Sequence, residues 1–128
     1  MSLPLVEITD ENEILYRRVF YKHIKRKRVR LEAFKLRGPH ELGVSVSLAR
    51  YTTPEAILAR GLPGQTLVML QAQVPFALNL KILHAPEEDD PSHCLLVGDN
   101  SDDICDQLAA ACELVPRPPS SLEPVGSG

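Results

Sequence analysis

The sequence contains no tryptophan, and only three phenylalanines and three tyrosines occur among its 128 residues. Any hydrophobic core must therefore be mostly aliphatic. Hydrophobic residues nevertheless make up 44% of the chain and charged residues 24%, a composition typical of globular proteins and not of disordered or fibrous ones. At this length we expect a single domain, residues 1–115, followed by a short tail.

Long apolar runs are also missing, and none approaches the roughly 18–20 residues that a membrane-spanning helix requires. Residues 1–7 lack the basic and apolar regions of a secretory signal. The three cysteines, Cys94, Cys105 and Cys112, are odd in number and poorly spaced for a disulfide framework. These observations predict no membrane partner, a cytoplasmic location and buried, reduced thiols.

The motifs that identify common cofactor and metal sites are absent. There is no glycine-rich nucleotide-binding loop, no HExxH and no CxxC. His84, His93 and Cys94 are candidate metal ligands, and residues 87–90 form an acidic run, but packing and solvation explain both better. We therefore expect no cofactor and no metal.

Positive charge is concentrated in one part of the chain. Ten of the fourteen lysines and arginines lie within residues 17–37, whereas residues 86–128 contain ten acidic residues and only one basic residue. Two hypotheses follow, and the sequence leaves both open. The basic segment binds an external anionic partner, or the acidic part of the same molecule neutralises it.

The alternation of apolar and polar residues predicts an α+β domain with a small mixed sheet of about five strands and two helices. Residues 1–12 are expected to be a polar lead-in. After a basic loop at 25–28, we expect a strand in which Val29, Leu31 and Ala33 face inward. The other expected strands are 13–21, 42–49, 66–74, 79–85 and 94–97.

Both expected helices have a clear start signal. Thr53 precedes Pro54 at the first helical position, and Gly61 ends that helix. Ser101 caps the second helix, which is expected to stop at Pro116. Its predicted core-facing stripe consists of Ile104, Leu108, Ala111, Cys112 and Val115. Residues 116–128 contain four prolines, so we expect a disordered tail.

Two short segments resemble the opening elements of the ADP-ribosyltransferase fold: Tyr16-Arg17-Arg18 on the first expected strand and Ser45-Val46-Ser47 on a later one. The resemblance implies an enzyme in which a strand arginine and a strand serine serve catalysis. That family also has an acidic residue on a late strand, where this chain has Gln71 and Gln73.

A second resemblance covers more of the chain. The segments LYRRV (15–19), Ala33-Phe34, VSVSLARYTTPE (44–55) and PSHCLLVGDNS (91–101) are similar to a family of small uncharacterised prokaryotic proteins. This resemblance implies a bacterial cytoplasmic setting and no particular activity.

Two functions of different classes follow. The leading hypothesis is a non-enzymatic interaction module that docks an anionic partner, in the first place a protein and alternatively a nucleic acid, through Lys22, Lys25, Arg26, Lys27, Arg28 and Arg30. The alternative is a compact ADP-ribosyltransferase-like or ribonuclease-like enzyme that uses Arg17, Arg18, Ser45 and His93. Only the enzyme requires these last four side chains to converge in one pocket.

Overall fold

The computed structural model describes residues 5–38 and 40–116. Within them a seven-stranded sheet has the order β1-β7-β8-β5-β2-β6-β9, and β3 and β4 form a separate hairpin. Every strand pairing is antiparallel. The strands are β1 (Val6–Ile8), β2 (Ile14–Phe20), β3 (Ile24–Lys25), β4 (Arg28–Val29), β5 (Val44–Leu48), β6 (Gln65–Gln71), β7 (Lys81–His84), β8 (His93–Val97) and β9 (Glu113–Leu114).

Three α-helices and three 3₁₀ helices complete the described part of the chain. They are α1 (Pro54–Ala59), α2 (Gln73–Ala77), α3 (Asp102–Ala111), η1 (Tyr21–His23), η2 (Leu31–Phe34) and η3 (Ala49–Tyr51). The expected α+β class is confirmed. The expectation of about five strands in a mixed sheet with two helices is wrong, because the sheet is larger and antiparallel and α2 is an additional helix.

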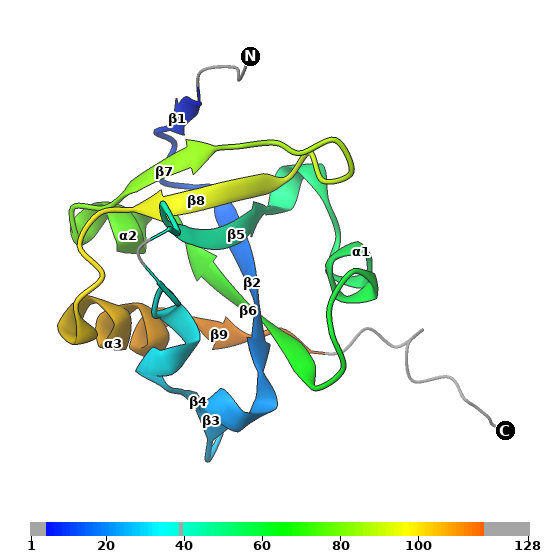
Figure 1. Cartoon of the computed structure of the whole chain (residues 1–128), viewed down its shortest axis with the longest axis vertical. Helices are drawn as coiled ribbons and strands as arrows, with labels where there is room; N and C mark the ends of the chain where they lie inside the picture. The colour runs from blue at the N-terminus through cyan, green and yellow to red at the C-terminus, as the bar shows by residue number, and fades with distance from the viewer. Residues whose placement is uncertain (1–4, 39, 117–128) are drawn as a thin grey trace, which may run out of the picture.

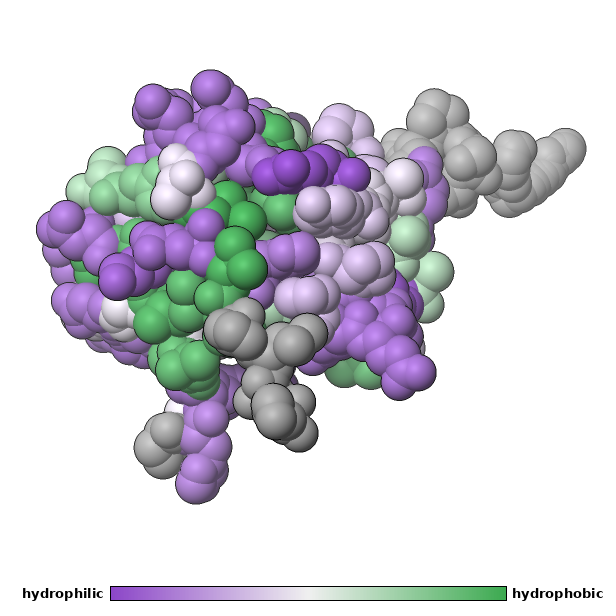
Figure 2. All heavy atoms as spheres, turned by 90° about the horizontal axis from the view of Figure 1, so that it is seen from above, coloured by the Kyte–Doolittle hydropathy of each residue, from purple (hydrophilic) through white to green (hydrophobic). Residues whose placement is uncertain are grey.

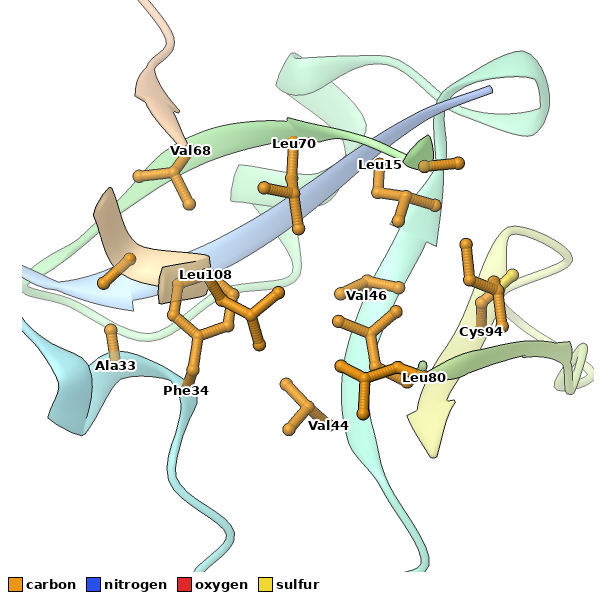
Figure 3. Close-up of a cluster of buried hydrophobic side chains, with 14 of the residues drawn as sticks. Leu15, Ala33, Phe34, Val44, Val46, Val68, Leu70, Leu80, Cys94 and Leu108 are labelled. Atoms are coloured by element: carbon orange, nitrogen blue, oxygen red, sulfur yellow. The ribbon is translucent and has the colours of Figure 1, made fainter. Parts of the chain in front are cut away.

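The sheet is strongly twisted, as Figure 1 shows: β7, β8 and β5 run across one end of the molecule, while β2 and β6 descend steeply from them. The core lies between this sheet and a layer made by η2 and α3. In Figure 3, Phe34 of η2 lies beside Leu108 of α3, and Leu15 and Val46 approach from β2 and β5. All four side chains are buried.

The helix starts agree with the predicted caps, but one helix end does not. The amide of Ala56 donates to Thr53 Oγ1 (3.2 Å), and that of Ile104 donates to Ser101 Oγ (3.3 Å). Helix α3 ends at Ala111 and not at Pro116, because the chain then pairs with β6 as strand β9. Its buried residues are Cys105, Leu108 and Ala109, whereas Ala111 of the predicted stripe is exposed.

The strand expected after the basic loop is wrong beyond Val29. The chain forms the 3₁₀ helix η2 instead, which buries the consecutive residues Ala33 and Phe34. A strand points successive side chains to opposite faces and cannot bury two neighbours against one core. Similarly, β6 stops at Gln71, and the remainder of the expected strand 66–74 enters helix α2.

Residues 1–12 are not merely a lead-in, because Val6–Ile8 pair with β7 as edge strand β1. The expected tail is outside the described residues except for Pro116. In the part of the chain that the structure describes, no helix combines the length and apolar character needed to cross a membrane. Figure 2 looks onto the end of the molecule near β1 and shows apolar side chains bordered by hydrophilic ones.

Candidate anion-binding pocket

Strands β2 and β5 separate shortly after they meet, and this separation creates a pocket. Strand β2 pairs with β6 along its whole length but with β5 only at Leu15 and Tyr16. The region where the two strands diverge is closed on another side by η2, residues 35–37 and Glu41. A pocket of about 410 Å³ lies between these segments, a size within the range of small-molecule sites.

Arg17 joins the segments around this pocket. Strand alternation places Arg17 on the same face as the buried residues Leu15 and Val19. Its Nε donates to the Ala33 carbonyl of η2 (2.8 Å), and its Nη1 donates to the Ser45 carbonyl of β5 (2.7 Å). Its guanidinium carbon also lies 5.5 Å from the centroid of the Phe34 ring. Arg17 therefore bridges β2, η2 and β5.

The charge of Arg17 belongs to no ion pair within the described residues. A guanidinium has five N–H donors, and only the two bonds to carbonyls engage them. No described carboxylate lies within 4.0 Å of Arg17. Burial, followed by the nearby charge of Arg37, lowers the pKa of Arg17 to about 10. The group is still protonated at neutral pH, so the pocket contains a half-buried cation with donors to spare.

The other charged groups that line the pocket are three basic and three acidic residues, but those outside ion pairs are mostly basic. Three of these groups are already in ion pairs. Lys35 pairs with Asp102 (3.1 Å), Glu32 pairs with Arg30 (3.5 Å), and Asp90 pairs with Arg60 (3.2 Å). Arg18, Arg37 and Glu41 also line the pocket, and none of the three belongs to an ion pair among the described residues. The pocket lining thus includes three arginines outside ion pairs, counting Arg17, and one such carboxylate, that of Glu41.

Ser45 and His93 form a hydrogen-bonded pair at the same pocket. His93 Nε2 lies 3.2 Å from Ser45 Oγ, and His93 Nδ1 lies 2.9 Å from the Ala85 carbonyl. A carbonyl oxygen only accepts, so in the neutral ring Nδ1 carries the proton and Nε2 accepts from the Ser45 hydroxyl. A Glu87 carboxylate oxygen lies 3.9 Å from Nδ1.

All four residues of the enzyme hypothesis line this one pocket: Arg17, Arg18, Ser45 and His93. Sequence reasoning missed Arg37 and Asn100. The side chain of Asn100 accepts from the Leu36 amide (2.9 Å) and donates to the Phe34 carbonyl (3.0 Å), which fixes the pocket wall to the start of α3. No signal in the sequence could have shown this, since Asn100 reads only as part of a turn.

The basic segment forms a feature separate from the pocket. The exposed residues Arg26 and Lys27 have φ values of 53° and 65° at the turn between β3 and β4, so the predicted exposed turn is confirmed. The six residues predicted to bind a partner are all exposed: Lys22, Lys25, Arg26, Lys27, Arg28 and Arg30. None of them lines the pocket described above.

Internal neutralisation of the basic segment is only partial. Arg30 pairs with Glu32 (3.5 Å), and the Lys22 ammonium lies 5.6 Å from the centroid of the Phe20 ring. Lys35, at the far end of the segment, pairs with Asp102 of α3. Within the described residues the cations of the hairpin itself, Lys25, Arg26, Lys27 and Arg28, belong to no ion pair.

His84, His93 and Cys94 do not belong to a metal site in the described part of the chain, where no three His, Cys, Asp or Glu residues are arranged to hold an ion. No known family model, curated protein or solved structure matches this chain. The two family resemblances therefore stay predictions, and the argument about function depends on the pocket and the hairpin.

Proposed function

We propose that the protein binds an anionic ligand in the pocket between β2 and β5 and that the group held there is a phosphate. The half-buried Arg17, which belongs to no ion pair among the described residues, carries the proposal. A charge removed from water is unfavourable unless it is paired, so an anion in the pocket would offset that cost. The planar fork of an arginine matches the oxygens of a phosphate. Arg18 and Arg37 line the same pocket and add to the attraction.

Titration of the protein with inorganic pyrophosphate by calorimetry tests this proposal. We expect Arg18→Gln and Arg37→Gln each to weaken binding about tenfold or more, the usual loss when a charged hydrogen-bond donor is removed. Lys81→Gln is the matched control, because Lys81 is an exposed cation on β7 that does not line the pocket. Equal losses in all three variants would contradict a specific site.

We further propose that the β3–β4 hairpin docks an acidic segment of a protein partner. The absence of ion pairs at Lys25, Arg26, Lys27 and Arg28 among the described residues supports this second function. Asp106 and Glu113 line a groove together with Lys27 and Arg28. A nucleic acid extending from the hairpin along this groove would meet these carboxylates, whereas a short acidic segment would not.

The hairpin proposal is tested by replacing its four cations, Lys25, Arg26, Lys27 and Arg28, with glutamine. Binding of wild type and variant to an acidic protein, single-stranded RNA and duplex DNA is measured at low and high salt. We expect the variant to lose affinity for the acidic protein while its melting temperature stays nearly constant, because exposed charges contribute little to stability. A steep loss with salt, seen only with RNA or DNA, would favour a nucleic acid instead. If the wild type and the variant bind the acidic protein equally, or if neither binds it, docking through the hairpin is refuted.

A further inference from the structure

We infer that Ser45 is a nucleophile and that His93 is its general base. In addition to binding anions, the pocket would then be the site at which Ser45 attacks the phosphorus of phosphate esters. The inference rests on the pocket proposed above as the functional site. It adds a reaction to that site, and it names a substrate class in which the phosphate group is held by the arginines and is also the group attacked.

The orientation of His93 is the first argument. A serine hydroxyl becomes a nucleophile when an imidazole nitrogen within hydrogen-bond reach removes its proton. The bond from Nδ1 to the Ala85 carbonyl leaves Nε2 free to accept, and Nε2 lies 3.2 Å from Ser45 Oγ. Glu87, at 3.9 Å from Nδ1, is placed to stabilise the imidazolium that forms when the proton is transferred.

The surroundings of Ser45 are the second argument, because neighbouring serines lack the same combination of base and access. Ser47 lies on the same face and is the register partner of His93, yet of these two serines it is Ser45 whose hydroxyl bonds to the ring. Ser92 is fully buried, and its hydroxyl donates to Asp90 (2.6 Å). Ser45 is exposed in the pocket, so a ligand can reach its hydroxyl.

The positive charge of the pocket is the third argument. As Ser45 Oγ bonds to phosphorus, its proton passes to His93 Nε2 and the bond from phosphorus to the leaving oxygen breaks. The leaving oxygen departs with the electron pair and takes up that proton. Arg17 and Arg18, which line the same pocket, supply positive charge that offsets the negative charge on the phosphoryl oxygens. Fixed positive groups at such a site stabilise the transition state more than they would in water.

A fluorophosphonate probe tests the nucleophile without knowledge of the natural substrate. In this reaction Ser45 Oγ bonds to phosphorus, fluoride leaves with the electron pair of the P–F bond, and the proton passes to His93. Intact-mass analysis and peptide mapping should show one adduct, on Ser45. Ser45→Ala should give none, and His93→Gln should slow labelling by about 100-fold, as expected when a general base is lost. Ser47→Ala, the matched control, should react at the wild-type rate.

No adduct on the wild-type protein, an adduct on another residue, or equal rates in wild type and His93→Gln would each overturn the inference. Repeating the labelling with inorganic pyrophosphate present separates it from the phosphate-binding proposal. If Ser45 is labelled and pyrophosphate does not slow the labelling, the result supports Ser45 as a nucleophile but counts against phosphate binding at the arginines. Retained pyrophosphate binding without any labelling overturns the nucleophile alone.

Discussion

Arg17 occupies a strand position between two buried aliphatic residues, Leu15 and Val19, where alternation alone would place an apolar side chain. It is tolerated there because its donors reach carbonyls on η2 and β5 and its guanidinium lies over the Phe34 ring. The same contacts direct the charge toward the pocket. A single residue thus has a structural role and, by our proposal, a ligand-binding role.

Leu108 provides the residue-scale test of the core. Its side chain is 1% exposed on the inner face of α3, so Leu108→Ala should lower the free energy of unfolding by about 2–5 kcal/mol. Gln107 is exposed on the same helix, and its side chain donates to Asp103, so Gln107→Ala should cost less than about 0.5 kcal/mol. Denaturant unfolding measures both values. Small and equal losses would contradict the packing of α3.

Cys94 provides a test that depends on pH. Burial, assisted by the charges of Glu13 and Asp90, raises the pKa of its thiol from 9.0 to about 11. In the unfolded chain the Cys94 thiol has the lower pKa, so it loses its proton at a lower pH than in the folded protein. The protonated thiol therefore contributes its full share to the free energy of unfolding below pH 9, and this share is lost as the pH rises to 11. Between these pH values, the free energy of unfolding should fall by about 2 kcal/mol more in wild type than in Cys94→Ala. Parallel profiles, measured by denaturant unfolding at several pH values, would refute this.

At the scale of elements, the helix starts were predictable because their determinants are local. A capping hydroxyl at Thr53 or Ser101 acts on an amide three residues away, which any reading of the sequence can find. The end of α3 was not predictable in this way. Strand β9 forms because residues 113–114 meet β6, a partner more than forty positions earlier in the chain.

The hairpin turn offers an element-scale prediction. Arg26 and Lys27 both have positive φ, which is unfavourable for residues with a side chain and is the conformation for which Asn-Gly is preferred in two-residue turns. The double substitution Arg26→Asn and Lys27→Gly should raise the free energy of unfolding by about 1 kcal/mol and weaken binding to an acidic protein. Thermal unfolding and a binding titration measure the two effects.

The control for this prediction removes the same charge outside the turn. Lys25→Gln with Arg28→Gln should weaken binding to a similar degree but leave stability nearly constant, because both residues are exposed and extended. A loss of stability in the Asn-Gly variant would show that the left-handed turn is held by contacts of the original side chains.

At the scale of the whole molecule, the expected tail should be dispensable. Within the described residues, the Val115 amide donates to the Leu67 carbonyl (2.9 Å), and residues 116–128 are rich in proline and serine. Removing 116–128 should change the melting temperature by less than about 2 °C. A larger decrease, measured by calorimetry, would show that this segment packs against the domain.

The sequence by itself determined the α+β class, the approximate positions of the central strands, the starts of α1 and α3 and the exposed basic turn. Each of these depends on alternation, capping or turn chemistry among neighbouring residues. It also singled out Arg17, Arg18, Ser45 and His93 as residue types suited to chemistry. Only the tertiary structure decided that these four line one pocket. Their shared place in the pocket lining follows from the pairing of β5 with β8 and the divergence of β5 from β2, and such long-range pairings are set by the packing of the whole core.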